Sequence, residues 1–190
     1  MRADLCGIDE AGRGPIAGNL VIAGCILKKP IDGLNDSKKL SEKKREALYE
    51  IIIKSSSYHI VRFSPKEIDK EGISLCLRRG LEEIMKNLAC SEYLFDGNST
   101  FGVSGLKTMI KADTKIPEVS AASILAKVTH DRDIIEVAKK YPMYGFEKHK
   151  GYGTALHIEM IKKHGYSEIH RKSYRLKALA PEGHAKPTLF

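Results

Sequence analysis

The spacing of hydrophobic residues divides the chain into strands and helices. Short, mainly apolar runs predict strands at residues 5–10, 19–27, 58–63, 92–96 and 107–111. Apolar residues at helical spacing predict helices at residues 41–54, 64–72, 73–88, 117–140, 154–165 and 167–177. Strands come first, helices then alternate with strands, and only helices follow. This order predicts an α/β fold with a mixed central β-sheet flanked by helices, plus a helical C-terminal extension.

Local signals support several of these boundaries. Ser64 can cap a helix, Pro65 suits its first position, and Glu67 completes a capping box. The connection between the strands at 5–10 and 19–27 is short, whereas a parallel crossover needs about a dozen residues or more. These two strands are therefore predicted to pair antiparallel.

The chain shows no internal repeat and no convincing domain linker. The small residues at 120–123 predict that the helix at 117–140 lies close against the sheet. We expect a main domain at 1–140, an extension at 141–180 packed on it as one unit, and a flexible tail at 181–190.

The composition is that of a globular protein with an excess of positive charge. Hydrophobic residues make up 42% and charged residues 29% of the 190 residues, which are ordinary proportions. The net charge is +8 at pH 7, and residues 139–177 contain ten Lys or Arg against three Glu. Scattered lysines would indicate only a solvated face. A local excess of this size favours a polyanionic partner, nucleic acid before an acidic membrane surface.

The cysteines and apolar runs bear on location. Cys6, Cys25, Cys76 and Cys90 form no C-x-x-C pair, so zinc binding is not predicted, and their mainly apolar neighbours predict buried free thiols in a reducing compartment. No run approaches the ~18 apolar residues of a membrane span, and the first residues lack the apolar part of a signal peptide. We therefore expect a cytoplasmic protein without membrane contact. Nothing in the sequence demands a partner chain, so a monomer is expected.

Acidic residues lie where three of the predicted strands end: Asp9 and Glu10, Asp96, and Asp113. Ligand sites in open α/β sheets lie at the carboxyl ends of strands, so the four carboxylates are expected at one edge. Their repulsion would raise their pKa values unless divalent cations such as Mg²⁺ or Mn²⁺ lay between them. Two such ions about 3.5–4 Å apart can activate a water and stabilise the leaving oxygen in phosphodiester hydrolysis.

Each acidic position also has a simpler interpretation. Asp-Gly-Asn at 96–98 is a favourable turn sequence, and Asp113 can cap the following helix. Neighbouring residues of a strand point to opposite faces, so Asp9 and Glu10 can share a site only if the strand ends there. The joint placement of these acids in a basic protein favours the metal site.

A Gly12-Arg13-Gly14 turn follows the first acidic pair. Glycine lets backbone N–H groups approach a ligand closely, and Arg13 offers a guanidinium to phosphate. The turn differs from a P-loop, because the Lys-Ser/Thr pair is missing.

Other polar residues are expected to lie outside the site. His157 and His164 are predicted to be solvated or near phosphate rather than metal ligands, and no His-Glu-x-x-His motif occurs. Asp131 and Asp133 are predicted on the surface of their helix, with a direct role for Asp131 as the lesser alternative.

Five stretches resemble the motifs of ribonuclease HII, in the family's order. The most specific are Gly-Ile-Asp-Glu-Ala-Gly-Arg-Gly-Pro at 7–15 and Ile-Pro-Glu-Val-Ser-Ala-Ala-Ser-Ile-Leu-Ala-Lys-Val at 116–128. Shorter matches are Asn-Asp-Ser-Lys at 35–38, Asp-Gly-Asn at 96–98 and His-Lys-Gly-Tyr-Gly-Thr at 149–154. One departure is Ala112, where a glycine is expected before the fourth acid.

The resemblance implies an RNase H-like fold and an endoribonuclease that hydrolyses the RNA strand of RNA–DNA hybrids. It also implies incision 5′ of a single ribonucleotide in duplex DNA, leaving a 5′-phosphate and a 3′-hydroxyl. Ribonucleotide removal and primer processing during replication would be the roles of such an enzyme.

The same resemblance implies specific residue roles. Mg²⁺ or Mn²⁺, two ions in the catalytic complex, would be held by Asp9, Glu10, Asp96 and Asp113. The implied substrate contacts are Gly12, Arg13 and Gly14 at the ribose 2′-hydroxyl, Tyr152 on the neighbouring deoxyribose, and Lys38 with Lys39 on phosphates.

Two other functions stay open. A non-catalytic nucleic-acid-binding protein would need only the basic segment, and the intact set of four acids favours the enzyme over it. The second is a ribonuclease H that prefers long hybrids, such as ribonuclease HIII. Residues 186–190, Lys-Pro-Thr-Leu-Phe, are similar to short apolar tails that dock on sliding clamps, so a clamp is a weaker partner prediction.

Overall fold

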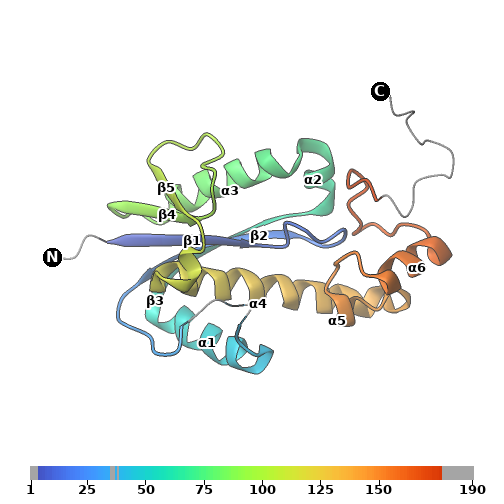
Figure 1. The fold of residues 1–190 in the computed structure, drawn as a ribbon, viewed down its shortest axis with the longest axis horizontal. Helices are drawn as coiled ribbons and strands as arrows, with labels where there is room; N and C mark the ends of the chain where they lie inside the picture. Colours follow the sequence, from blue (N-terminus) through green and yellow to red (C-terminus); the bar gives the residue numbers. More distant parts are fainter. Residues whose placement is uncertain (1–3, 35–36, 38, 177–190) are drawn as a thin grey trace, which may run out of the picture.

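The structure, a computed structural model, describes residues 4–34, 37 and 39–176. Its sheet has five strands in the order β3-β2-β1-β4-β5 (Figure 1). The strands are β1 (Leu5–Ala11), β2 (Leu20–Leu27), β3 (Ser56–Phe63), β4 (Glu92–Asp96) and β5 (Leu106–Met109). β2 pairs antiparallel with β1 and with β3, whereas β4 runs parallel to β1 and to β5. The predicted mixed sheet and its antiparallel first pair are confirmed.

Helices cover both faces of this sheet. The described helices are α1 (Glu42–Ser55), α2 (Pro65–Glu71), α3 (Ile73–Asn87), α4 (Pro117–Lys140), α5 (Phe146–His149) and α6 (Ala155–His164), with 3₁₀ turns η1 (Ala112–Thr114) and η2 (Pro142–Tyr144). Figure 1 shows α2 and α3 on one face and α1 and α4 on the other. The strands alternate accordingly: Ile8 and Ile22 belong to the core under α3, and Val21 and Ala23 to the core under α4.

Helix α4 lies directly on the central strand β1, as its small residues predicted. A Cβ atom on Gly7 would lie 2.2 Å from backbone atoms of Glu118 and of Val119, so only glycine allows this approach. The residues that follow in α4, 120–123, are buried. The helix runs along β1 toward the acidic residues, which brings Ser123 into hydrogen-bond contact with Asp9.

Side-chain caps lie at several helix starts, and the capping box predicted at Ser64 is confirmed. At α2, Ser64 Oγ accepts the N–H of Glu67 at 3.3 Å, and the Glu67 carboxylate accepts the N–H of Ser64 at 2.8 Å. At α6, Thr154 Oγ1 accepts the N–H of His157 at 3.3 Å.

The helix predicted from residue 167 onward is absent, and residues 167–176 form turns and an isolated β-bridge. Their backbone pairs with the loop after β1: the N–H of Arg171 donates to Ile16 and the N–H of Gly18 donates to Ile169, both at 2.9 Å. The buried Arg171 side chain also donates to the Gly18 carbonyl through Nε and Nη2. Long-range hydrogen bonds therefore replace the local ones of a helix.

The C-terminal part shares a third core with the loop after β1 and the end of α4, which includes Ile16, Ile134, Phe146 and Ile161. Residues 177–190 lie outside the described part, so the predicted tail at 181–190 stays a prediction. Among the helices that the structure describes, none is long and apolar enough to cross a membrane.

Candidate active site

Three aspartates from separate elements meet at one edge of the sheet. Asp9 is in β1 and Asp96 ends the parallel neighbour β4, so the two carboxylates reach the same edge. Asp113 was predicted at a strand end, but β5 ends at Met109 and Asp113 lies in η1. Asp96 Oδ1 accepts the Ala112 N–H at 3.2 Å, which ties η1 to β4. One carboxylate oxygen of each aspartate lies within 4.8 Å of the others.

Glu10 lies beside this group without belonging to its closest set. β1 continues through Glu10 to Ala11 in its pairing with β2, so the strand does not end where the shared site required. Its pairing with β4, however, ends at Ile8. Because β1 has no parallel neighbour beyond that point, Asp9 and Glu10 both line the pocket at the open edge.

Burial and repulsion make this edge unfavourable for negative charge. Burial raises the pKa of Asp9 well above its usual range; Glu10 and Asp96 raise it further, while a hydrogen bond from Ser123 opposes them. Burial also raises the pKa of Glu10, against the charge of Arg13 3.7 Å away. Glu10 Oε2 is buried and has no hydrogen-bond partner among the described residues. Crowded carboxylate oxygens with an orphaned acceptor fit a hard divalent cation such as Mg²⁺ or Mn²⁺.

Two adjoining pockets place the other predicted residues around the acids. The first, of about 430 Å³, is lined by Asp9, Glu10, Asp96 and Asp113 together with Arg13, Lys39 and Lys111. The second, of about 280 Å³, shares Asp9, Glu10 and Arg13 and adds Gly12, Gly14, Ser37, Ser123, Lys127 and Tyr152. The turn and the tyrosine, far apart in sequence, thus line one pocket beside the acids. Lys38 lies outside the described residues.

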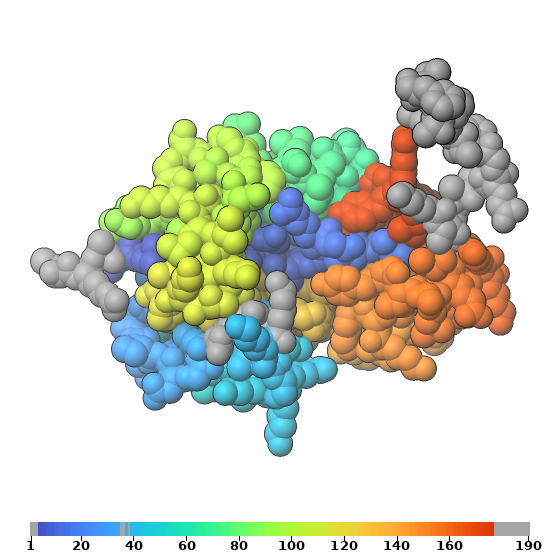
Figure 2. Space-filling view, viewed as in Figure 1, coloured from blue at the N-terminus to red at the C-terminus, as the bar shows by residue number. Residues whose placement is uncertain are grey.

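Hydrogen bonds from the C-terminal segment hold the glycine turn in place. Gly12 has φ +85°, and a Cβ there would lie 2.4 Å from the Asn19 carbonyl oxygen. The Arg13 carbonyl accepts the Tyr174 hydroxyl at 2.9 Å and Arg171 Nη1 at 3.3 Å. Figure 2 shows the blue N-terminal segment reaching the surface between the yellow-green segment before α4 and the orange C-terminal segment.

Tyr152 reaches the second pocket from the loop between α5 and α6. Its side chain is 44% exposed, and its Cε1 lies 3.8 Å from where a Cβ on Gly14 would be. The Ile16 N–H donates to the Gly151 carbonyl at 2.9 Å, which holds the tyrosine loop against the loop after β1.

A buried ion cluster on α4 corrects one sequence prediction. Asp131 is 6% exposed rather than on the helix surface. It accepts Lys127 Nζ at 2.8 Å and His130 Nδ1 at 3.1 Å, with Arg45 3.9 Å away. Burial alone would raise the pKa of Asp131, but the hydrogen bonds from His130 and Lys127 lower it below its ordinary value.

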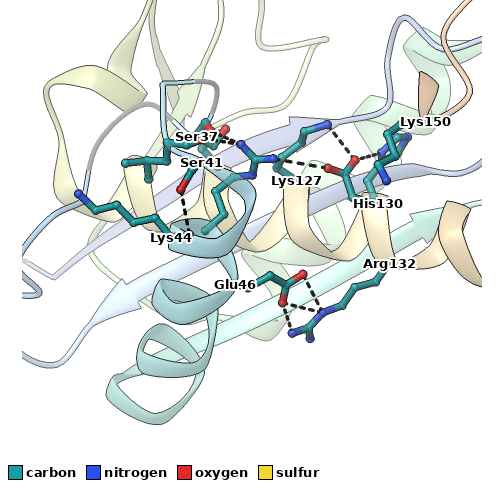
Figure 3. Close-up of polar contacts among 12 residues, drawn as sticks. Ser37, Ser41, Lys44, Glu46, Lys127, His130, Arg132 and Lys150 are labelled. Atoms are coloured by element: carbon teal, nitrogen blue, oxygen red, sulfur yellow. Dashed lines mark hydrogen bonds and ion pairs between the residues drawn. The ribbon is translucent and has the colours of Figure 1, made fainter. Parts of the chain in front are cut away.

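Lys127 also lines the pocket of the glycine turn, a position that sequence reasoning missed. Figure 3 shows Lys127 and His130 on one side of α4 and Arg132 turned the other way, toward Glu46. The four-residue spacing of Lys127 and Asp131 was the available signal. Asp133 is partly exposed, near its predicted place, and pairs with Arg62 at 2.9 Å.

The prediction for His157 is also wrong, because its side chain is fully buried, whereas His164 at the end of α6 is exposed as expected. The reason is tertiary: the segment after α6 folds back and covers His157 with His170.

Known proteins match this chain over most of its length. The family model of ribonuclease HII matches residues 6–177. A ribonuclease HII of Sulfurovum sp. is 64% identical over 186 residues, covering 98% of this chain and 96% of the relative. A ribonuclease HII of Aliarcobacter butzleri is 57% identical over 178 residues, covering 93% of each.

Solved structures agree with the fold. The Archaeoglobus fulgidus protein in a PCNA:RNase HII complex superposes with a TM-score of 0.79 at 29% identity, covering 92% of this chain and 96% of that one. The Pyrococcus horikoshii ribonuclease H2 gives a TM-score of 0.73 at 29% identity, covering 90% and 93%. These likenesses confirm the RNase H-like α/β fold. With a family match over nearly the whole chain and relatives of such high identity, this protein belongs to the ribonuclease HII family.

Proposed function

We propose that this ribonuclease HII cleaves the RNA strand of RNA–DNA hybrids and also incises duplex DNA on the 5′ side of a single embedded ribonucleotide. The products are a 5′-phosphate and a 3′-hydroxyl, which suits ribonucleotide removal and primer processing. One observation carries the proposal: the carboxylate cluster and the Gly12-Arg13-Gly14 turn line adjoining pockets that share Asp9, Glu10 and Arg13. A scissile phosphate at the acids would therefore have its sugar at the turn.

Asp9, Glu10, Asp96 and Asp113 would hold two Mg²⁺ or Mn²⁺ ions. Such ions, when bound, supply an activated water and Lewis-acid stabilisation of the leaving oxygen. The chain's own part is to fix the four carboxylates before substrate arrives, through β1, β4 and the Asp96–Ala112 hydrogen bond. Lys39 and Lys111, which line the same pocket, lie where the substrate's phosphates would pass.

The substrate's ribose would be recognised next to the carboxylate cluster. The Arg13 carbonyl already accepts two hydrogen bonds, from Arg171 and Tyr174. We therefore assign contact with the ribose 2′-hydroxyl, the group that separates RNA from DNA, to the backbone N–H groups of the turn. Tyr152 would pack on the next sugar, where an added hydroxyl would clash. This arrangement gives sensitivity to the RNA–DNA junction.

The test is a labelled duplex with one ribonucleotide, incubated with purified protein and Mg²⁺ or Mn²⁺. Incision directly 5′ of the ribonucleotide is expected, with an all-DNA duplex of the same sequence left intact. A long RNA–DNA hybrid assayed in parallel compares the two substrates, and a strong preference for it would favour the ribonuclease HIII-like alternative. No incision with either ion would favour a non-catalytic binding protein.

We also propose a sliding clamp as a partner of residues 186–190, which lie outside the described part. The archaeal relative solved as a PCNA complex supports this. A pull-down with purified bacterial clamp should capture the full chain and lose it when these five residues are removed. Equal capture of both forms would contradict this role of the tail.

A further inference from the structure

Three histidines lie beneath the loop that carries Tyr152, and the cleavage proposed above uses none of them. His149 ends α5, His157 lies in α6 and His170 follows α6; all three side chains are buried. The rings of His149 and His157 stack with centroids 4.2 Å apart and planes 16° apart. Phe146 packs edge-on against His157 at 5.2 Å. The imidazoles are therefore held in fixed orientations.

Hydrogen bonds join two of these rings into a chain that ends at Tyr152. His170 Nδ1 lies 2.9 Å from the backbone nitrogen of Ser167 and 2.7 Å from its Oγ. The Nε2 atoms of His170 and His157 are 3.0 Å apart. His157 Nδ1 lies 2.9 Å from the carbonyl oxygen of Tyr152. The four residues thus form one continuous relay from Ser167 to Tyr152.

The direction of the relay follows from its two ends. A backbone N–H only donates, so His170 Nδ1 must accept from Ser167 and its proton lies on Nε2. His170 Nε2 then donates to His157 Nε2, which leaves the His157 proton on Nδ1, facing a carbonyl that only accepts. Both rings must be neutral. A second proton on His157 would place two N–H groups 3.0 Å apart, and a second proton on His170 would face the Ser167 N–H at 2.9 Å. Burial lowers the pKa of both histidines to about 4, which keeps them neutral at pH 7.

The relay fixes the backbone of Tyr152, whose side chain is partly exposed to solvent. The Tyr152 carbonyl accepts the Thr154 N–H at 2.8 Å as well as His157 Nδ1. The Tyr152 N–H donates to the His149 carbonyl at 2.9 Å. Because the ring is 44% exposed, its position depends on this anchored backbone more than on packing around the ring.

We propose that His157 and His170 are positioning residues for Tyr152, and that the relay from Ser167 sets the enzyme's selectivity for the RNA–DNA junction. The inference rests on the proposed role of Tyr152 at the sugar. It assigns to the segment after α6 a function in substrate choice, although its own side chains do not line the pocket of the glycine turn.

Two substitutions of His157 separate the two ends of its ring. In His157→Asn the amide nitrogen can take the place of Nδ1 and keep the bond to Tyr152. In His157→Gln the amide reaches the place of Nε2 and keeps the contact with His170 only. The readout is kcat/KM on a single-ribonucleotide duplex divided by kcat/KM on a long hybrid, with kcat and KM determined separately. We expect the Gln variant to lower this ratio about tenfold, the effect of one lost buried hydrogen bond. The Asn variant keeps the bond to Tyr152 and loses only the link to His170, so it should lower the ratio less.

The controls are His164→Gln, an exposed position on the same helix, and Tyr152→Ala. Equal ratios for wild type, His157→Asn and His157→Gln would overturn the inference, and they leave the proposed function intact if Tyr152→Ala still lowers the ratio. A ratio unmoved by Tyr152→Ala would overturn both the role of Tyr152 and the relay. If the Gln variant melts below the assay temperature, Ser167→Ala decides instead. It removes one bond at the outer end and should lower the ratio less, and an unchanged ratio would contradict the relay.

Discussion

At the residue scale, Asp96 combines two tasks that one substitution separates. Its carboxylate faces the proposed ion site, and its Oδ1 also accepts the Ala112 N–H. Asp96→Asn keeps a carbonyl oxygen for Ala112 but removes the charge. We expect cleavage to fall roughly 10³-fold, because ion-assisted stabilisation contributes several kcal/mol, while duplex affinity stays within a few-fold. Single-turnover cleavage and fluorescence anisotropy measure the two quantities.

The matched control is Asp133→Asn on α4, whose carboxylate pairs with Arg62 away from both pockets. This variant should cleave at the wild-type rate. Turnover of Asp96→Asn comparable to wild type would remove Asp96 from the ion site.

The two glycines of the turn make a second residue-scale test. Gly12→Ala meets a positive φ and the Asn19 carbonyl at 2.4 Å, whereas a Cβ on Gly14 makes an ordinary 3.8 Å contact with Tyr152. Gly12→Ala should cost about 2–4 kcal/mol of stability, or roughly 5–15 °C in Tm, and Gly14→Ala should shift Tm by about 2 °C or less. Thermal unfolding followed by circular dichroism measures both, and equal shifts would contradict the account of this turn.

At the scale of elements, α6 and the segment that folds back on it carry a pH dependence. Burial lowers the pKa of His157 and of His170 to about 4, against about 6.5 in an unfolded chain. Between these values the unfolded state binds more protons than the folded state, so stability falls as the pH falls from about 6.5 toward 4. Each histidine contributes up to about 1.4 kcal/mol per pH unit within that window.

His157→Gln should therefore flatten the fall of Tm between pH 7 and 5 by roughly 2–4 °C per pH unit. The stacked ring of His149 and the charged groups beside His170 are the same in both proteins; these groups are Lys66, Asp69, Lys70, Glu168 and Lys172. The difference between the curves therefore reports the loss of His157, including its effect on the pKa of His170. The exposed His164→Gln variant serves as control. Parallel curves for wild type and His157→Gln would show that His157 is not a buried neutral group.

At the scale of the whole molecule, the sheet brings acidic side chains close together, and in the metal-free protein no cation lies between them. Asp9 and Asp113 are 8% and 5% exposed, and Glu10 Oε2 has no partner among the described residues. A divalent ion that binds only the folded state raises its stability by about 2.7 kcal/mol at 100 times its dissociation constant. We therefore expect Mg²⁺ or Mn²⁺ to raise the Tm of metal-free protein by roughly 5–10 °C.

Differential scanning fluorimetry after chelator treatment measures this shift, with NaCl of equal ionic strength as control. The double variant Asp96→Asn/Asp113→Asn should start from a higher metal-free Tm and respond much less. A full response in the double variant would place the ion elsewhere.

Much of the fold and the identity of the acids were predictable from local patterns. The periodicity at 117–140 and the cap at Ser64 correspond to α4 and α2, because helix signals act within a few residues of one another. Asp9, Asp96 and Asp113 stood out because they follow apolar runs, and carboxylates gathered at one sheet edge repel one another unless cations lie between them.

Only the tertiary structure decided how distant residues share a site. Asp131 was predicted on the surface of its helix, and His157 was predicted to be solvated or near phosphate. Both are buried beside partners that periodicity does not reveal, Arg45 of α1 for Asp131 and His170 for His157. The segment 167–176 carries a helical pattern, yet its backbone pairs with the loop after β1, since those long-range bonds come with burial of Arg171. The sequence by itself determined which groups are candidates for the chemistry, through their charge and local conformation. Packing decided where they meet, because contacts between elements depend on the whole sheet and its helices being in place.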